Sequence, residues 1–311
     1  MASELRQTAT VYLGFTGRNL LVYLKNRMTV FFSLLSPLIV LALYLLFLKR
    51  LQLNSIGSAI EDSIAYFSSS DIEGLVDANL LSGIVGTTMV TVPLGALQPM
   101  VEDRERKIDY DCRVAIKKPA LMILGYITAA FIVTFAIALA VFLVGIGIEA
   151  ALGQLRMTLG IFAMVAGTIA LGSLSASSAM AGIIGFFTHT NAMSGFATIV
   201  STLVGFVIGA YVPLAVLPKA VQIVASSFPA SHATGILRNL LITPYLNAMQ
   251  ANLPAEVAGQ WRAEMNSAFG LNVNFFGTVI GTPTMWIYLA CTLPLFFALD
   301  VVVYRVSSRR K

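Results

Sequence analysis

Six long apolar runs constrain the fold of this 311-residue chain more than any other feature. A bilayer core about 30 Å thick requires roughly 20 apolar residues in a helix. Charged residues make up only 11% of the chain, against about 25% in soluble domains. The sequence therefore predicts an all-α membrane protein with one transmembrane domain over residues 1–311. The six predicted spans cover residues 28–48, 80–101, 120–148, 157–187, 192–212 and 283–304.

The distribution of Lys and Arg predicts the orientation. With a cytoplasmic N-terminus, the inner segments carry 14 of these residues and the outer segments 6, which together make the 20 in the chain. Cytoplasmic loops of membrane proteins are enriched in Lys and Arg, so both termini are predicted to be cytoplasmic. The same rule explains the net charge of +5 without a nucleic-acid partner. We expect a multi-pass protein in the cell (plasma) membrane, of a bacterium.

Two segments on either side of the first span lack the length and apolarity of a span. Residues 1–27 place apolar and polar side chains on different helical faces, which predicts an interfacial amphipathic helix. Its apolar face would hold Leu5, Ala9, Tyr12, Leu13, Thr16 and Leu20, and its polar face Arg6, Thr10 and Arg18. The segment after residue 48 is rich in Ser and Gly and is predicted to be a solvated outer loop. Its acidic residues are Glu61, Asp62, Asp71, Glu73 and Asp77.

The segment 102–118, EDRERKIDYDCRVAIKK, carries eleven charged residues in seventeen. It is too short to form a domain and too charged to lie in lipid. It is either a solvated cytoplasmic turn or a docking element, because interleaved charges on a short helix favour directional pairing with a complementary groove. The candidate docking residues are Glu102, Asp103, Arg104, Glu105, Arg106, Lys107 and Asp109.

Prolines divide the long segment 213–282. Pro213, Pro218 and Pro229 each disfavour a continuous helix, which predicts two short helices that dip part-way into the membrane as a re-entrant hairpin. Such irregular backbone has to pack against protein. The remainder is predicted to form a small external helical cap. In the fifth span, Gly205 and Gly209 have G-x-x-x-G spacing, which suits either a dimer seam or an internal helix contact.

No sequence motif for catalysis is present. The chain has no G-x-x-x-x-G-K-[ST], H-E-x-x-H, paired C-x-x-C or G-x-S-x-G motif, so we expect no catalytic residue and no metal or cofactor in this chain. His189 and His232 fall on opposite sides of the predicted topology and would not share a metal. Glu149 and Asp300 fall near span ends, so a buried ion relay is not expected. Energy for transport would have to come from another subunit, unless the protein is passive.

Three segments, in order, carry a family resemblance: RNLLVYLKNRMTVFFSLLSPLIVLALYLLFL, VEDRERKIDYDCRVAIKKPALMILGYI and GAYVPLAVLPKAVQIVASSFPASHATGILRNLL. They are similar to an interfacial helix leading into a span, an acidic–basic loop, and a proline-punctuated external hairpin. With these features the chain resembles the ABC-2 family of exporter permeases, which have the type V ABC exporter fold. The resemblance implies pairing with a second permease copy or a paralogue. It also implies two ATPase subunits, which would hold the ATP and Mg.

The resemblance further implies roles for particular segments. The loop Glu102 to Lys118 would be the coupling helix between the second and third spans, inserted into a groove of the ATPase and flanked by the N-terminal helix. The pathway would run at the dimer interface along the first, second and fifth spans, the last with Gly205 and Gly209. The outer gate would contain the three prolines of the hairpin. Lys107, Ile108 and Asp109 stand where many relatives have a Gly-Thr pair.

The predicted function is the membrane subunit of an ATP-driven exporter for an amphipathic or hydrophobic substrate. A drug-like molecule is the first expectation, followed by a lipid or an antimicrobial peptide, because an apolar pathway does not compensate a buried charge. The alternatives are an ABC-coupled sensor, a passive channel, and a membrane enzyme acting on a lipid-linked substrate. The enzyme would use carboxylates of the loop 102–118, but neighbouring Arg and Lys would compete for them.

Overall fold

The computed structural model describes residues 2–43, 46–47, 49–50, 52–54, 66–116, 118–210, 218–275 and 278–309. Helices make up nearly all of this part of the chain, and a two-stranded ribbon forms the rest of its regular structure. In chain order the elements are α1 (Ala2–Lys25), α2 (Arg27–Leu43), α4 (Ser69–Ala96), α5 (Gln98–Glu105), α6 (Ile108–Ala115), α7 (Pro119–Ala151), α8 (Leu159–Ile184), α9 (Thr190–Val207), α10 (Lys219–Ser227), α11 (Pro229–Ala251), α12 (Ala255–Ala268), β1 (Val273–Phe275), β2 (Thr278–Ile280) and α13 (Thr282–Arg309).

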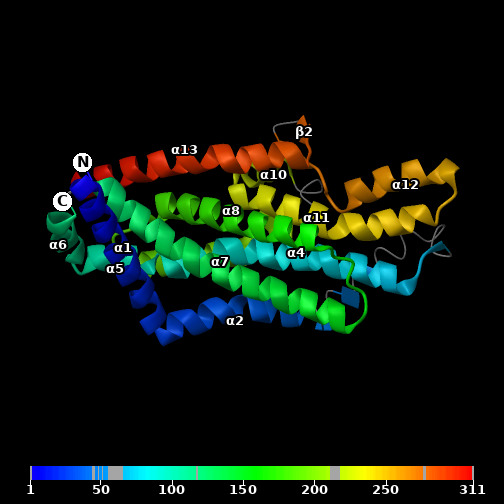
Figure 1. The fold of residues 1–311 in the computed structure, drawn as a ribbon, viewed down its shortest axis with the longest axis horizontal. Helices are drawn as coiled ribbons and strands as arrows, with labels where there is room; N and C mark the ends of the chain where they lie inside the picture. Colours follow the sequence, from blue (N-terminus) through cyan, green and yellow to red (C-terminus); the bar gives the residue numbers. More distant parts are fainter. Residues whose placement is uncertain are drawn as a thin grey trace.

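The long helices run along one axis of the molecule (Figure 1). Among the described residues, five stretches are long and apolar enough to cross a membrane: α4 with α5, α7, α8, α9 and α13. Helices α1 and α2 make a sixth when they are taken together as one bent span. The prediction of a multi-pass helical membrane protein is therefore confirmed. Both α1 and the last turns of α13 lie at the end that carries α5 and α6, and α12 lies at the opposite end (Figure 1).

Helix α4 is the centre of the bundle and packs against α7, α8 and α11. Glycines permit the closest approaches in this core. A Cβ atom at Gly86 would lie 2.1 Å from the Thr234 hydroxyl, and one at Gly172 would lie 2.8 Å from both the Ala233 Cβ and the Met89 sulfur. Because small residues let helices approach closely in lipid, these positions fix how α4, α8 and α11 interlock.

The segment between the fifth and sixth spans differs in part from its prediction. Pro218 directly precedes α10 and Pro229 is the first residue of α11, where a missing N–H costs nothing, while Pro213 lies outside the described residues. Helix α10 is short, as predicted. Helix α11, in contrast, has 23 residues, accommodates Pro244 and is buried over most of its length. It is thus a core element, because α4, α8 and α13 surround it.

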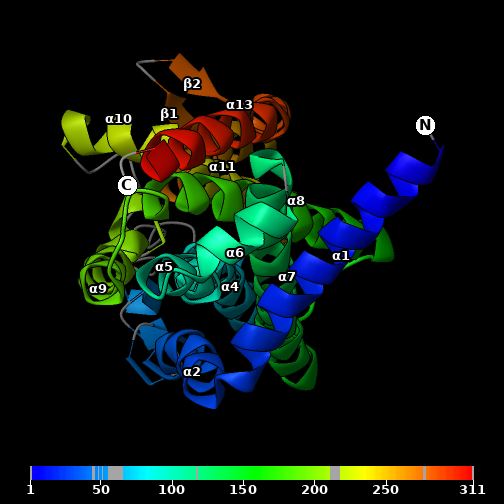
Figure 2. The ribbon, with the colours of Figure 1, turned by 90° about the vertical axis from the view of Figure 1, so that its left-hand side faces the viewer.

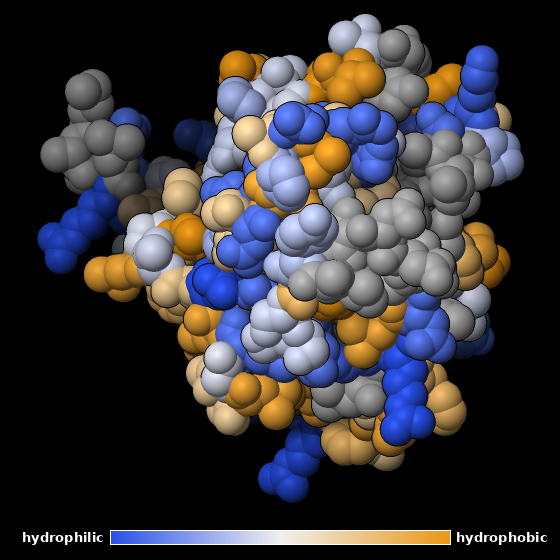
Figure 3. All heavy atoms as spheres, turned by 90° about the vertical axis from the view of Figure 1, so that its right-hand side faces the viewer, coloured by the Kyte–Doolittle hydropathy of each residue, from blue (hydrophilic) through white to orange (hydrophobic). Residues whose placement is uncertain are grey.

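The end of the molecule that carries α12 contains more than the helical cap that the sequence predicts. Beside α12, strands β1 and β2 pair antiparallel, with Val273 opposite Ile280. A ribbon this short was not expected for an all-α protein. Figure 3 shows that this end of the molecule is a mixture of hydrophilic and hydrophobic residues.

The prediction of a solvated acidic loop is wrong for its second half. Helix α4 begins at Ser69, so Asp71 and Asp77 lie on a helix and are buried. Asp71 accepts a hydrogen bond from Arg156 at 2.6 Å, and Asp77 accepts one from Lys49 at 2.9 Å. The basic partners allow burial because each of them neutralises a carboxylate. Glu73 also pairs with Lys49, and Glu61 and Asp62 lie outside the described residues.

Helix α1 forms as predicted, but its faces are used differently. It meets α2 at an angle of 77°, which would lay it along the membrane surface if α2 follows the membrane normal. Phe15 is buried against Gly125 and Tyr126 of α7. Leu13 of the predicted apolar face is 64% exposed, whereas Arg18 of the predicted polar face points into the protein. The exposed leucines suit contact with lipid.

Candidate functional site

The turn between α5 and α6 is the most highly charged part of the described chain. Helix α5 continues the second span to Glu105, a turn follows at Arg106 and Lys107, and α6 then runs back across the end of the bundle (Figure 2). Lys107 has a φ of 61° and is the only non-glycine residue with positive φ in the described ranges. We call residues 102–115 the elbow. The first four residues of the predicted loop thus belong to the end of a span, and α6 is a separate short helix.

Asp103 anchors the elbow to α1 and α7. Its carboxylate is buried and accepts hydrogen bonds from the two terminal nitrogens of Arg18, at 2.5 and 2.6 Å. The Tyr126 hydroxyl donates a third hydrogen bond at 2.6 Å. A bidentate Arg–carboxylate pair is both strong and geometrically specific. Helix α1 is therefore fixed to the elbow by the Arg18–Asp103 ion pair, to which the Tyr126 hydroxyl adds a hydrogen bond.

Arg104 is also buried, and it points in a different direction. Its Nη1 donates to the carbonyl oxygens of Gly185 and Phe187, which follow α8, at 2.5 and 3.2 Å. Its guanidinium lies 5.3 Å from the ring centre of Tyr304 on α13, a cation–π distance. Carbonyl groups after the end of a helix favour a cation. Arg104 therefore joins the elbow to the end of α8 and to α13.

Two carboxylates complete the network. Asp109 is buried and pairs with Arg113 on α6, whose guanidinium lies 5.4 Å from the same Tyr304 ring. Glu105 is exposed and accepts two hydrogen bonds from Thr190, the first residue of α9. Glu102 accepts a hydrogen bond from Gln98 within α5. The elbow thus contacts α1, α7, α8, α9 and α13 through polar groups.

The predicted docking residues consequently fall into two sets. Asp103, Arg104 and Asp109 are each about 2–3% exposed and their contacts lie inside the bundle, so they are not part of the exposed surface, and a docking role for them stays a prediction. Physically, each charge is compensated inside the bundle. The exposed face of the elbow instead comprises Arg106, Lys107, Tyr110, Asp111 and Val114, whereas Glu105 is engaged by Thr190. Val114 is 80% exposed, and the sequence alone did not single it out.

A hollow of about 310 Å³ lies between α2, α4, the start of α5, and α9. In the view down the bundle from the elbow end, α9 lies to the left of α4 and α2 lies below it (Figure 2). None of the residues that line the hollow is charged. They are Met28, Thr29, Phe32, Ser33, Thr91, Leu94, Gly95, Gln98, Ala197 and Ser201. The first, second and fifth predicted spans therefore meet around a cavity of mixed apolar and weakly polar character.

The G-x-x-x-G interpretation of the fifth span is wrong as a helix-packing motif. Helix α9 ends at Val207, and Gly209 lies beyond it with a φ of 71°, a conformation that glycine adopts without steric cost. Its carbonyl accepts a hydrogen bond from Arg238 of α11 at 2.5 Å. Gly205 is buried on α9. The two glycines therefore do not share a helix face, and a role for them in the pathway stays a prediction.

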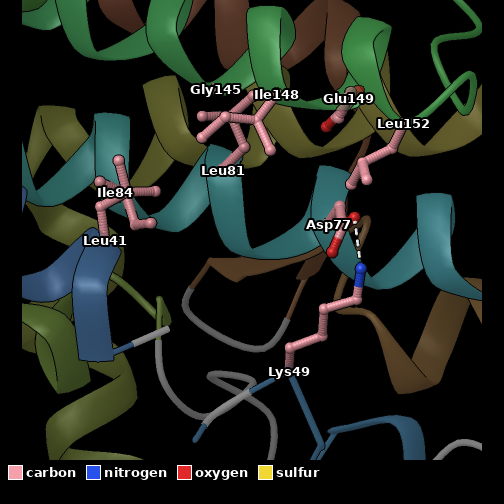
Figure 4. Close-up of a pocket in the computed structure, with 9 residues that line it drawn as sticks. All are labelled: Leu41, Lys49, Asp77, Leu81, Ile84, Gly145, Ile148, Glu149 and Leu152. Carbon is pink, nitrogen blue, oxygen red and sulfur yellow. Dashed lines mark hydrogen bonds and ion pairs between the residues drawn. The ribbon is translucent and has the colours of Figure 1, made fainter. Parts of the chain in front are cut away.

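Two carboxylates expected at accessible span ends are buried. Asp300 on α13 is 1% exposed; one oxygen accepts a hydrogen bond from Ser178 at 2.8 Å, and the other has no partner among the described residues. Glu149 on α7 is 5% exposed and faces a small cavity that Lys49 and Asp77 also line (Figure 4). The sequence offered no signal for either burial, because both depend on partners from distant helices.

No described group of three or more His, Cys, Asp or Glu side chains is arranged to hold a metal ion. His232 lies buried in α11, where its Nε2 is 2.6 Å from the Ser226 carbonyl oxygen and its ring packs on Tyr288. His189 lies at the other end of the bundle, 3.7 Å from Glu105.

Comparison with known protein families gives a match over most of the chain. The profile of a family described as ABC-2 family transporter protein matches residues 73–301, which is nearly three quarters of the chain. No curated protein matches the sequence significantly. The matched residues include the elbow, α9, α11 and most of α13.

Proposed function

Since the chain belongs to the ABC-2 family of transporter proteins, we propose that it is the permease subunit of an ATP-binding-cassette exporter for an amphipathic or hydrophobic substrate. Permeases of this family work with an ATPase subunit, so the energy source lies outside this chain. The observation that carries the proposal is the position of the elbow, which presents an exposed surface and is bonded to five helices of the bundle.

The exposed face of the elbow is the proposed contact with the ATPase subunit. It combines both charge signs with an apolar residue, Val114, and an aromatic one, Tyr110. Apolar and aromatic anchors contribute most to binding at interfaces, while surrounding charges set orientation and partner choice. The buried set, with Asp103 and Arg104, would then transmit force instead of touching the ATPase. In this assignment the elbow end of the molecule faces the cytoplasm, with both termini.

The hollow between α2, α4 and α9 is the proposed entry of the pathway. Its volume of about 310 Å³ falls in the lower range of small-molecule pockets, which are about 300–1,000 Å³. The absence of charge in its lining supports an uncharged or amphipathic cargo, because a charged group would lose its hydration without a compensating partner. A drug-like molecule fits best, followed by one end of a lipid or of an antimicrobial peptide.

The full assembly in this proposal has two permease chains, identical or paralogous, and two ATPase subunits that hold ATP and Mg. The hollow would be closed by the second permease chain, because Met28, Phe32 and Ser201 in its lining are exposed in the single chain. The outer gate would contain Pro213, Pro218 and Pro229, at the level where α10 meets α11. The expected location is the cell membrane of a bacterium.

Binding of the ATPase is tested by Val114→Glu. We expect the substitution to abolish co-purification of the ATPase subunit encoded with this chain, because it places a charge at the most exposed apolar residue of the elbow. The matched control is Val257→Glu, which makes the same change at a 48% exposed valine of α12 at the opposite end. If Val114→Glu retains the ATPase as well as the control does, the elbow is not the contact.

Transport is tested in proteoliposomes that contain the permease and the ATPase. Probes of three classes are compared with and without ATP: a neutral lipophilic dye, a fluorescent phospholipid and a cationic antimicrobial peptide. Ser201→Trp fills the hollow and should stop ATP-driven movement of the correct class, whereas Ile199→Trp, on the opposite and 61% exposed face of α9, should not. Equal movement with and without ATP would favour a passive channel and refute the proposal.

A further inference from the structure

Helix α9 is, together with α13, one of the two least embedded candidate spans. Only Met193, Val204 and Gly205 are buried among its 18 residues. Of the residues in its most apolar stretch, 17% are buried within the chain, compared with 89% for the span formed by α4 and α5. Segments with few buried contacts move at low free-energy cost. The position of α9 therefore depends mainly on what holds its ends.

The elbow end of α9 is held by two consecutive residues of α5. Arg104 grips the carbonyl oxygens of Gly185 and Phe187 before the turn that leads into α9. Glu105 then accepts from the Thr190 backbone N–H at 2.9 Å and from the Thr190 hydroxyl at 2.7 Å. A carboxylate at a helix N-terminus satisfies a free N–H and interacts favourably with the helix dipole. A movement of α5 would thus be passed directly to the start of α9.

The other end of α9 is held by the core. Arg238 of α11 is 4% exposed, and its Nη2 donates to the Gly209 carbonyl oxygen two residues after α9 ends. Helix α11 packs against α4, α8 and α13, so this attachment joins α9 to the most rigid part of the bundle. Gly209, with its φ of 71°, is also the point at which the helical path breaks. The outer end is thus suited to act as a pivot.

The hollow lies between these two attachments, with Ala197 and Ser201 as its lining from α9. At a rise of about 1.5 Å per residue, Thr190 lies about 28 Å and Ser201 about 12 Å from Gly209. A rigid swing about Gly209 therefore moves Ser201 by about 0.4 of the displacement at Thr190. Even a small shift of the elbow would change the width of the hollow.

We propose that α9 is a lever: the Arg238–Gly209 contact is its pivot, and α5 drives its elbow end through the positioning residues Arg104 and Glu105, so that movement of the elbow opens or closes the hollow. The proposal rests on the proposed function, since the ATPase supplies the movement. It assigns Glu105 a role in transmission within the chain, although this residue is exposed.

The test measures the width of the hollow and not transport. The complex of permease and ATPase is purified and placed in nanodiscs, with Cys112 and Cys291 replaced by serine and Ser201→Cys as the only thiol of the permease. The reaction rate of this thiol with the impermeant reagent MTSET is measured without nucleotide and after trapping with ATP and vanadate. The rate should change on trapping in this background.

Glu105→Ala removes the acceptor and should eliminate that change while the ATPase stays bound. Glu105→Gln keeps an acceptor oxygen for Thr190 and should restore the change. Thr190→Pro removes both donors and should behave like Glu105→Ala. Proline suits this position, the first of the helix, because His189 before it is extended (φ −127°, ψ 134°). Glu102→Ala is the matched control and should leave the change intact, because Glu102 is on the same helix and, in the part of the chain that the structure describes, its side chain accepts a hydrogen bond from Gln98 and none from α9.

The outcomes separate the two proposals. A full trapping response in Glu105→Ala and Thr190→Pro, with the ATPase bound, overturns the lever and leaves the proposed function standing. Loss of the response in Glu102→Ala as well would overturn the specific role of Glu105. A wild-type chain that retains no ATPase overturns the proposed function and the lever with it.

Discussion

The contact between Asp103 and Arg18 should carry a measurable part of the stability of the elbow end of the bundle. Breaking a buried pair by removing one partner costs about 3–5 kcal/mol, whereas an exposed pair contributes about 0.2–1 kcal/mol. The Asp103 side chain is 4% exposed and that of Arg18 is 33% exposed, so Arg18 is partly rehydrated when its partner is lost. We therefore expect Asp103→Ala to cost about 2–3 kcal/mol, between the two limits.

Tyr126→Phe removes only one of the three hydrogen bonds that Asp103 accepts. It should cost about 1.5 kcal/mol, the lower end for a hydrogen bond to a charged group, because Arg18 still compensates the carboxylate. The order of destabilisation is thus Asp103→Ala first and Tyr126→Phe second. Arg18→Ala combined with Asp103→Ala completes a double-mutant cycle, whose coupling energy should exceed about 1 kcal/mol.

The assay is reversible unfolding in mixed micelles of dodecyl maltoside and SDS, followed by circular dichroism. Since α1 could detach without global unfolding, trypsin cleavage at Lys25 and Arg27 serves as a second, local readout. Both variants should speed that cleavage, in the same order. A coupling energy below about 0.5 kcal/mol, the usual limit of additivity, or Tyr126→Phe exceeding Asp103→Ala, would refute the assignment of this pair as the anchor of α1.

Three further predictions follow from individual contacts. Gly172→Val places atoms against Ala233 and Met89, so it should lower the free energy of unfolding by about 1–3 kcal/mol through overpacking, measured by the same unfolding assay. Gly167→Val is the control on the same helix, and it should be neutral because nothing lies within 4 Å of its Cβ position. Ser178→Ala leaves buried Asp300 without its hydrogen bond and should destabilise by about 1–3 kcal/mol, whereas Asp300→Asn should cost less because it removes the charge. Burial raises the pKa of the Cys112 thiol, so a smaller fraction of it is thiolate at any given pH. Alkylation of Cys112 by iodoacetamide should therefore need a higher pH than alkylation of the thiol introduced by Val114→Cys, and equal pH profiles would contradict this.

The sequence was sufficient for the features that the bilayer dictates. Apolar runs identified the spans, since length and hydropathy alone determine whether a helix crosses lipid. The prolines located the starts of α10 and α11, because proline fits the first turn of a helix and disfavours its interior. The charged segment 102–118 was also recognised as a short element between two spans that is too charged to lie in lipid.

The sequence was insufficient wherever a side chain is buried by a partner from another helix. Asp71 needs Arg156, Asp77 needs Lys49, and Asp300 needs Ser178; none of these pairs is local, so a single sequence shows only the isolated carboxylate. The same reason explains why α11 was predicted to be short. Helix α11 packs against α4, α8 and α13 on different faces. A helix that is buried on all sides shows no simple periodicity of apolar residues in its sequence.

The division of the elbow into buried and exposed charges gives the charge density of this segment a physical meaning. A merely solvated turn would leave its charges in water, where ion pairs contribute little. Here Asp103 and Arg104, adjacent in sequence, are buried in different directions, one towards α1 and α7 and the other towards α8 and α13. Buried charges of this kind are costly unless their partners stay in place. The elbow therefore cannot shift without either moving these helices or leaving its buried charges without partners. A segment that converts a push at its exposed face into a movement of the bundle must be coupled to the helices in this way.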